Sequence, residues 1–201
     1  MADDIANTLS ELNVLFQDTI LGILGFTQSG SPPAYDSLAY SAVRVSWPTD
    51  GAPAWKIDDD VVFLKTQEEE DLYSRPREIL HTTTGSVTLN EATGYTRVIG
   101  LNLILYGPNS FSNAQLIRDE FYIDSNRIIF AKKNLYLIPD VVTPTRFPEN
   151  FSGRWWERTD IDFKFNEKII RNKGISIIES VEIGVHNKDG LISEIEVVTD
   201  E

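Results

Sequence analysis

Two long runs of alternating residues near the C-terminus constrain the fold more than any other part of the sequence. In the first run, Trp156–Phe165, charged residues fall at every second position and mostly apolar residues fall between them. The second run, Ile175–Val185, alternates in the same way. A period of two is typical of strands with one buried face. Because each run exceeds the usual strand length of roughly 5–6 residues, they predict a long antiparallel β-ribbon whose strands are joined by a charged, glycine-ended turn.

Two helices are predicted to pack on this sheet. In residues 3–25, apolar residues recur at spacings of three and four, which is one face of an α-helix, and Asp3 and Asp4 stand where carboxylates favour a helix N-terminus. Further along, Ser112 and Gln115 match a capping box, Ser at the cap and Gln three residues later. The helix that follows is expected to extend toward Lys133, with Ser125-Asn126 as a possible interruption.

The remaining elements are shorter strands separated by polar loops. Strands are expected at Val43–Trp47, Val61–Leu64, Thr96–Tyr106, Leu135–Pro139 and Leu191–Val198, and Thr96–Tyr106 is apolar enough to lie at the centre of the sheet. Residues 27–39, Pro144–Pro148 and about 67–93 are expected to be loops. The whole chain, 1–201, is therefore predicted to be one α+β domain: a mostly antiparallel sheet with two main helices on one face and a long ribbon near the C-terminus.

Both helices carry a second set of apolar residues on another side. In the first helix these are Val14 and Leu21, seven residues apart; in the second they are Leu116, Ile123 and Phe130, again spaced by seven. One interpretation is that each helix is sunk in its own core or exposes a few apolar residues. The other is that these residues contact a neighbouring subunit.

Composition excludes several classes of protein. The chain has no cysteine, so disulfides, thiolate metal sites and cysteine catalysis are excluded. A formal net charge of −13 disfavours general binding to nucleic-acid backbones or anionic membranes. The N-terminus has no signal-peptide pattern, and the longest apolar run, Val98–Tyr106, is too short to cross a membrane. We therefore expect a soluble protein made in the cytoplasm.

No catalytic motif is recognisable, and carboxylates are the abundant candidates. The two histidines, His81 and His186, are interpreted as surface residues. Asp160 and Asp162 share one face of a predicted strand, roughly 6–7 Å apart, which is compatible with paired-carboxylate catalysis. Arg158 and Lys164 flank them on the same face. Ion pairing is therefore the preferred interpretation.

Two acidic runs and a pair of tryptophans also allow both a structural and a functional interpretation. Asp58–Asp60 lacks the glycine and distant glutamate of a calcium loop, and Glu68–Asp71 is most simply a solvated charge run. Neighbouring residues of a strand face opposite sides, so Trp155 is expected toward the core and Trp156 on the charged face. Trp156 either lies over Arg or Lys side chains or anchors an interface.

The first alternating run resembles the tail terminator, or neck terminator, proteins of tailed bacteriophages. The resemblance rests on an aromatic residue followed by Glu-Arg-x-Asp and alternating apolar residues, here Trp156–Phe165, and on Ile178–Ile183 further on. Arg97–Tyr106, a helix, and a strand around Leu135–Pro139 precede it in the same order. The resemblance covers residues 95–185, and residues 49–93 do not align with the family.

This resemblance implies a structural virion protein without catalysis or cofactors. Such proteins are made in the host cytoplasm and assemble as a ring, typically of six copies, on the head-proximal end of the tail tube. The partners implied are the tube protein, the head–tail connector or stopper, and a sheath protein where one exists. DNA passes through the lumen without specific binding.

The residues expected at subunit contacts or in the lumen come from both helices and from the charged strand face. They are Val14, Leu21, Leu116, Ile123, Phe130, Trp156, Arg158, Asp160 and Asp162. Two alternatives remain open at this point: another virion part, such as a head-closure, adaptor or baseplate protein, and a carboxylate-based hydrolase.

Overall fold

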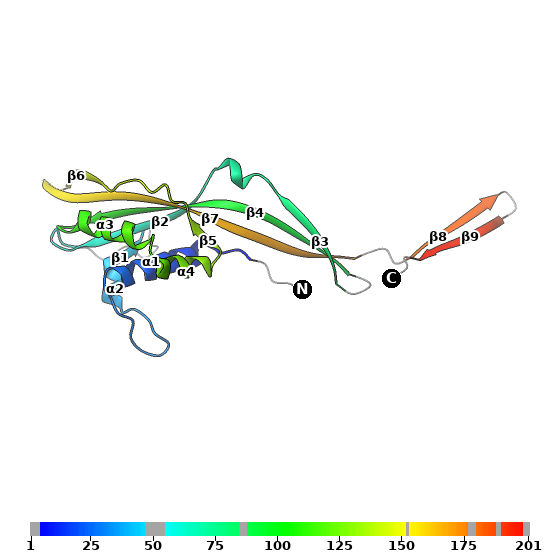
Figure 1. Cartoon of the computed structure of the whole chain (residues 1–201), viewed down its shortest axis with the longest axis horizontal. Coiled ribbons are helices and arrows are strands. Elements are labelled where there is room, and N and C mark those ends of the chain that lie inside the picture. Colours follow the sequence, from blue (N-terminus) through cyan, green and yellow to red (C-terminus); the bar gives the residue numbers. More distant parts are fainter. Residues whose placement is uncertain are drawn as a thin grey trace. The chain divides into compact units, whose positions relative to one another are not determined.

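A computed structural model describes residues 5–46, 55–84, 88–151, 153–176, 180–187 and 190–198. It confirms the predicted α+β class (Figure 1). The helices are α1 (Leu9–Ile23), α2 (Ser37–Ala42), α3 (Ser110–Glu120) and α4 (Asp124–Ala131), with a short 3-10 helix at Leu72–Ser74. The strands are β1 (Val43–Val45), β2 (Val61–Glu69), β3 (Glu78–Thr84), β4 (Thr88–Tyr106), β5 (Leu135–Leu137), β6 (Thr145–Phe151), β7 (Arg154–Ser176), β8 (Ser180–Asn187) and β9 (Gly190–Val198).

The chain divides into two compact units. The single domain predicted from the sequence stays a prediction. One unit contains residues 7–76 and 96–168, and we call it the helical unit. The other contains residues 1–6, 77–95 and 169–201, and we call it the strand unit. Strands β4 and β7 contribute residues to both.

The helical unit is a sheet with helices on one face. Its strand order is β1-β2-β4-β7-β5, with β6 paired to β7. Only the β1–β2 pair is parallel among the described pairings whose register is known. As predicted, the strand at Thr96–Tyr106 is central, since β4 lies between β2 and β7.

The core forms where the alternating face of β7 meets the helices. Ile161, Phe163 and Phe165 are fully buried. The Phe165 ring lies 5.0 Å from that of Phe16 on α1 and 5.2 Å from that of Phe130 on α4. In Figure 1, α1 and α4 accordingly run side by side along the same side of the strands. The period-two pattern of β7 therefore places the helices.

The strand unit is built from strand pairs. β3 pairs antiparallel with the first part of β4, from Glu78–Gly94 to Thr84–Thr88. Ile5 and Ile170 form an isolated antiparallel bridge. β8 and β9 form a separate two-stranded antiparallel sheet.

The predicted ribbon is wrong in its pairing. β7 runs through Asn166–Gly174, where a turn was expected, because β5 and the Ile5–Ile170 bridge pair with this segment and override its turn-like composition. Consequently Trp156–Phe165 does not pair with Ile175–Val185. β8 pairs instead with β9, which confirms the final strand at Leu191–Val198.

The predicted irregular loop at 67–93 is also wrong. It holds the end of β2, the 3-10 helix, β3 and the start of β4. Polar residues at both strand faces hid the strand pattern, although threonine favours strands. The predicted loop at 27–39 is confirmed except for its last three residues, which begin α2. The predicted loop at Pro144–Pro148 is wrong, since it contains most of β6, which tolerates Pro148 because it pairs with a strand on one side only in the described chain.

The helix boundaries differ from the expected ones. α1 begins at Leu9, not near residue 3, because Thr8 and Glu11 form a reciprocal capping box. The second helix begins at Ser110, two residues before the predicted cap at Ser112, and it ends at Glu120. α4 follows after Ile123, whose extended backbone (ψ 138°) interrupts the predicted helix just before Ser125-Asn126, where an interruption was expected.

Candidate contact surfaces

The charged face of β7 is held by ion pairs and hydrogen bonds. The Arg158 guanidinium donates to both Asp160 carboxylate oxygens, at 2.8 and 2.7 Å, and this raises the pKa of Arg158. Asp162 accepts a hydrogen bond from Asn102 Nδ2 at 2.6 Å. Lys164 pairs with Glu69 at 2.7 Å. The ion-pair interpretation of Asp160 is confirmed, and Asp162 is held by an amide rather than by Lys164.

The acidic runs have structural partners as well. Asp60 accepts hydrogen bonds from the Asn109 backbone N–H and side-chain amide, at 2.9 and 2.7 Å, just before α3. In the second run, Glu68 pairs with Arg97 at 3.2 Å and Glu70 with Arg75 at 2.7 Å. Among the described residues, no group of three or more His, Asp or Glu side chains is arranged to hold a metal ion.

The histidines lie on strands, His81 exposed on β3 and His186 within β8.

An aromatic cluster lies on the polar side of the sheet in the helical unit. The Trp55 ring lies 5.0 Å from Phe63, 5.7 Å from Tyr106 and 6.0 Å from Trp156. The Tyr106 hydroxyl donates to Glu149 at 2.8 Å. Burial and this hydrogen bond raise the pKa of Tyr106 to about 12. The Trp156 ring therefore packs against Trp55, which precedes β2, and against Tyr106 on β4.

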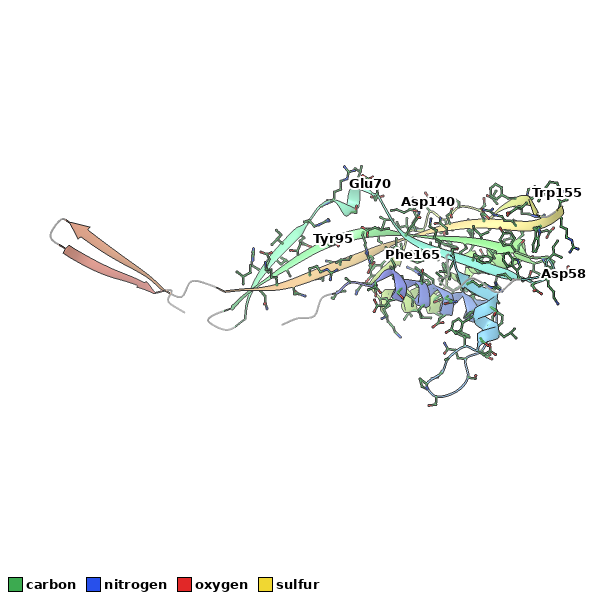
Figure 2. All side chains as sticks on the ribbon, turned by 180° about the vertical axis from the view of Figure 1, so that it is seen from behind. Asp58, Glu70, Tyr95, Asp140, Trp155 and Phe165 are labelled. Carbon is green, nitrogen blue, oxygen red and sulfur yellow. The ribbon has the colours of Figure 1, made fainter. Side chains whose placement is uncertain are left out.

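Above this cluster lies an exposed surface that we call the β6–β7 surface. It consists of Arg146, Phe147, Pro148, Trp155, Trp156, Glu157 and Arg158, around a shallow hollow of about 440 Å³. Trp155, which Figure 2 labels, lies near the start of β7 and is 67% exposed, and Phe147 on β6 is 47% exposed. Trp and Arg are enriched at the energetic centres of protein interfaces. The surface therefore has the composition of a protein contact site.

The expectation that Trp155 faces the core is wrong. The first fully buried residue of its face is Thr159. At this end β7 pairs with β6, and most of the described residues of β6 are themselves exposed.

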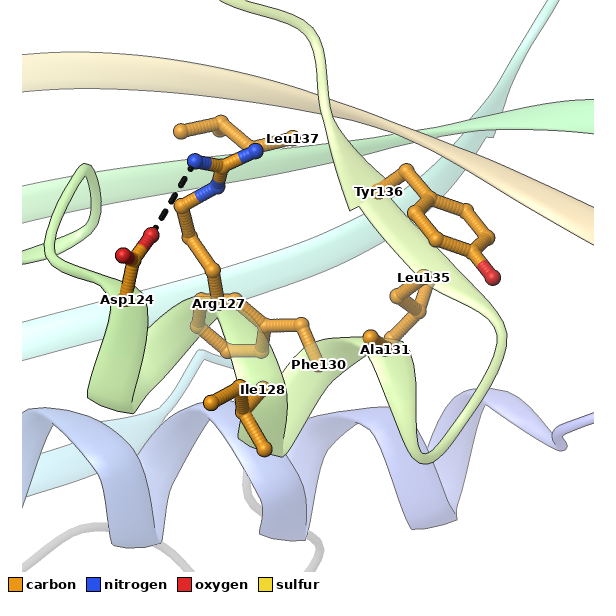
Figure 3. Close-up of a pocket in the computed structure, with 8 residues that line it drawn as sticks. All are labelled: Asp124, Arg127, Ile128, Phe130, Ala131, Leu135, Tyr136 and Leu137. Atoms are coloured by element: carbon orange, nitrogen blue, oxygen red, sulfur yellow. Dashed lines mark hydrogen bonds and ion pairs between the residues drawn. The ribbon is translucent and has the colours of Figure 1, made fainter.

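A second surface lies on α4 and β5, and we call it the α4–β5 patch. Its apolar members Ile123, Ile128, Ile129 and Tyr136 are between 40% and 55% exposed. Arg127, Lys132 and Lys133 are exposed beside them. A hollow of about 330 Å³ opens between the two elements, lined by Phe130, Leu135 and their neighbours, with Arg127 bonded to Asp124 at its rim (Figure 3).

The two predicted helix stripes divide into exposed and buried residues. Val14, Leu116 and Ile123 are exposed, at 52%, 42% and 46%. Leu21 and Phe130 are fully buried, so predicting them at a surface was wrong.

The reason lies in which elements pack on each helix, and the sequence pattern did not show this. α2 and β1 lie against α1, where Gln17 Nε2 donates to the Val43 carbonyl at 2.6 Å, and Leu21 belongs to the same core as Val43. The break after Phe121 turns Phe130 inward, where its ring lies 5.2 Å from that of Phe121. Phe147 and Tyr136 were not predicted at a surface; each is an aromatic residue on a short edge strand, and Phe147 directly precedes Pro148.

None of the described helices is long and apolar enough to span a membrane. The described chain thus combines an α+β fold, ion-paired carboxylates and two exposed surfaces that contain aromatic residues, which is the composition of a protein contact site. A family model described as phage neck terminator protein matches residues 10–190, and the chain therefore belongs to that family. No curated protein matches the chain.

Membership of this family makes the chain a structural protein of the phage neck. It belongs to the tail and neck of the virion and interacts with other head or tail proteins.

Proposed function

We propose that the chain is the subunit of a closed ring of six copies that caps the head-proximal end of the tail tube and joins it to the head connector. The observation that carries the proposal is the family match over residues 10–190. The partners are the tube protein, the connector or stopper protein and, in a contractile tail, the sheath protein. The protein acts without catalysis or a cofactor, and it is made in the host cytoplasm.

Two different exposed surfaces support a ring. A ring requires a heterologous interface, in which one patch of a subunit meets a different patch of the next. The helical unit has such patches in the α4–β5 patch and the β6–β7 surface. Val14 and Leu116 on the helices, and Trp156, Arg158, Asp160 and Asp162 on β7, are proposed to face a neighbour or the lumen.

Charge supports the passage of DNA through the lumen without specific binding. Six copies at −13 each carry a formal charge of −78. Phosphate backbones bind to clustered Lys and Arg and are repelled by like charge.

An amber mutation in the gene for this chain tests the proposal in infected cells. We expect tails of uncontrolled length, or tails of normal length that fail to join heads, when particles are imaged by electron microscopy. Supplying the wild-type chain from a plasmid is the control and should restore virions. Normal virions from the mutant contradict the proposal. Filled heads that leak DNA beside length-controlled, capped tails indicate a head-closure protein, and a complete lack of tails indicates a baseplate protein.

A further inference from the structure

A short turn directly after β2 carries an exposed leucine beside carboxylates. We call residues 70–74 the acidic turn; it includes the 3-10 helix at Leu72–Ser74. Leu72 is 73% exposed. The Glu70 side chain is 84% exposed and pairs with Arg75 at 2.7 Å. Ion pairs this exposed contribute little to stability, so Glu70 can exchange Arg75 for a cation of another chain.

The acidic turn lies on the side of the sheet away from α1 and α4. Figure 2 labels Glu70 where the chain projects from the strands of the helical unit, and in both views α1 and α4 lie on the other side of these strands. The turn therefore points away from the α4–β5 patch of its own copy. It can meet such a patch only on another copy.

The hollow of the α4–β5 patch is complementary to this leucine. Single exposed apolar residues are common on protein surfaces, so Leu72 indicates a contact only where a matching site exists. Phe130 and Leu135, which line the hollow, are fully buried, and Ile128 beside them is 55% exposed (Figure 3). The hollow measures about 330 Å³. An apolar cavity of about 150 Å³ already holds a benzene molecule, so a leucine side chain fits.

Two lysines beside the hollow are complementary to the carboxylates of the turn. Lys132 and Lys133 lie between α4 and β5, and both are exposed. Neither forms an ion pair with another described residue. Such a pair of cations stands out in a chain whose net charge is −13. Because Glu70 and Leu72 lie two residues apart in one turn, the charged and the apolar contact can form together.

We propose that the acidic turn of one copy inserts Leu72 into the hollow of the α4–β5 patch on the next copy, and that Glu70 pairs there with Lys132 or Lys133. The proposal rests on the ring proposed above and names its interface. This interface is heterologous, as ring closure requires, because the turn and the patch are different parts of the chain.

Site-specific cross-linking tests this contact, and the absence of native cysteine means that only the introduced thiols react. Two chains with different tags, one Leu72→Cys and the other Ile128→Cys, are produced in cells infected with wild-type phage, whose own copies keep the ring closed. Purified tails are then treated with a short bis-maleimide. The matched control replaces Leu72→Cys with Leu38→Cys on α2, because Leu38 is 74% exposed and Leu72 is 73% exposed.

We expect a product that carries both tags, at about tenfold the yield of the control pair, because insertion holds the two thiols at high effective concentration. Adding Lys132→Glu and Lys133→Glu to the Ile128→Cys chain should lower this yield about threefold. Glu70→Lys on the Leu72→Cys chain should then restore it. A yield that neither change alters contradicts the charge pairing.

Three results overturn the contact itself. The first is rings at the tail end that contain both tagged chains but give no two-tag product, and the proposed function then stands. The second is an equal yield from the control pair. The third is cross-linking within a single chain that carries both Leu72→Cys and Ile128→Cys. If tails show no ring and contain neither tag, this contact and the proposed function both fail.

Discussion

At the residue scale, the stability of the fold depends on the buried carboxylate of Glu167. It is fully buried and accepts hydrogen bonds from Arg97 Nε at 2.8 Å and from the Asn7 backbone N–H at 2.9 Å. Glu167→Ala removes the buried partner of a largely buried guanidinium, which keeps only its pair with the exposed Glu68 and its hydrogen bond to the Asn7 carbonyl. We expect this to cost roughly 3 kcal/mol of unfolding free energy. Glu70→Ala, which breaks the exposed pair with Arg75, should cost less than about 1 kcal/mol. Urea denaturation measures both; equal losses contradict the prediction.

A glycine is required at position 107 because the backbone φ is positive there and because neighbouring atoms leave no room for a Cβ. Its φ is +109°, and a Cβ there would come within 2.5 Å of Asp60 Oδ1 and 2.6 Å of the Asp59 carbonyl oxygen. Gly25 has a φ of +86° with nothing within 4 Å of a Cβ. We therefore expect Gly25→Ala to cost about 1–2 kcal/mol from backbone strain alone, and Gly107→Ala to cost more. Thermal denaturation of the two variants compares them, and a smaller loss for Gly107→Ala would refute the role of the contacts.

Tyr106 gives the fold a sensitivity to high pH. Its pKa is raised to about 12 in the folded chain, first by burial and then by the hydrogen bond to Glu149, against an ordinary value of about 10. The folded state thus holds this proton more tightly, so the stabilisation is complete below pH ~10 and is lost as the pH rises through about 12. A phenolate absorbance titration should show a step near 12 that Tyr106→Phe removes. If the absorbance change that Tyr106→Phe removes lies near pH 10 instead, the assignment is contradicted, whatever the other six tyrosines show.

At the scale of elements, one aromatic side chain joins α1 and α4 to β7. Phe165 is fully buried, with ring contacts to Phe16 and Phe130. Phe165→Ala should therefore lower the free energy of unfolding by about 3–5 kcal/mol. Phe147→Ala on β6, where the ring is 47% exposed, removes the same atoms and should cost less than about 1 kcal/mol. Guanidinium denaturation monitored by circular dichroism distinguishes them, and similar midpoints would show that Phe165 does not hold the layers together.

The same scale shows what sequence patterns predict and what they do not. The alternation in Trp156–Phe165 identified a strand and its buried face, because burial of one face follows from local period. It did not identify the partner of that strand, since pairing with β4, β5 and β6 depends on residues distant in sequence. β3 was missed because its threonines lie between polar neighbours on both faces and leave no hydrophobic period to detect.

For the molecule as a whole, exposure was the hardest property to predict. Leu21 and Phe130 had the same spacing pattern as Val14 and Leu116, yet only the latter two are exposed. Which residue is covered depends on where α2 and β1 pack and on the break between α3 and α4. The strand at β1 was predicted, but its packing against α1 was not, and neither α2 nor the position of the break has a strong sequence signal. The family could be predicted without knowing which residues are exposed, because the resemblance rests on the Glu-Arg-x-Asp pattern, which is visible in the sequence itself.

The charge of the whole chain leads to a prediction about DNA. A net charge of −13 should prevent binding to duplex DNA even at roughly 50 mM salt, where non-specific complexes of basic proteins are strong. Fluorescence anisotropy of a labelled short duplex should therefore stay flat as the purified chain is added, up to about 100 μM, beyond the usual non-specific range. A basic DNA-binding protein in the same buffer is the positive control. Binding that weakens steeply with added salt would reveal a phosphate contact site and contradict a lumen that lets DNA pass without holding it.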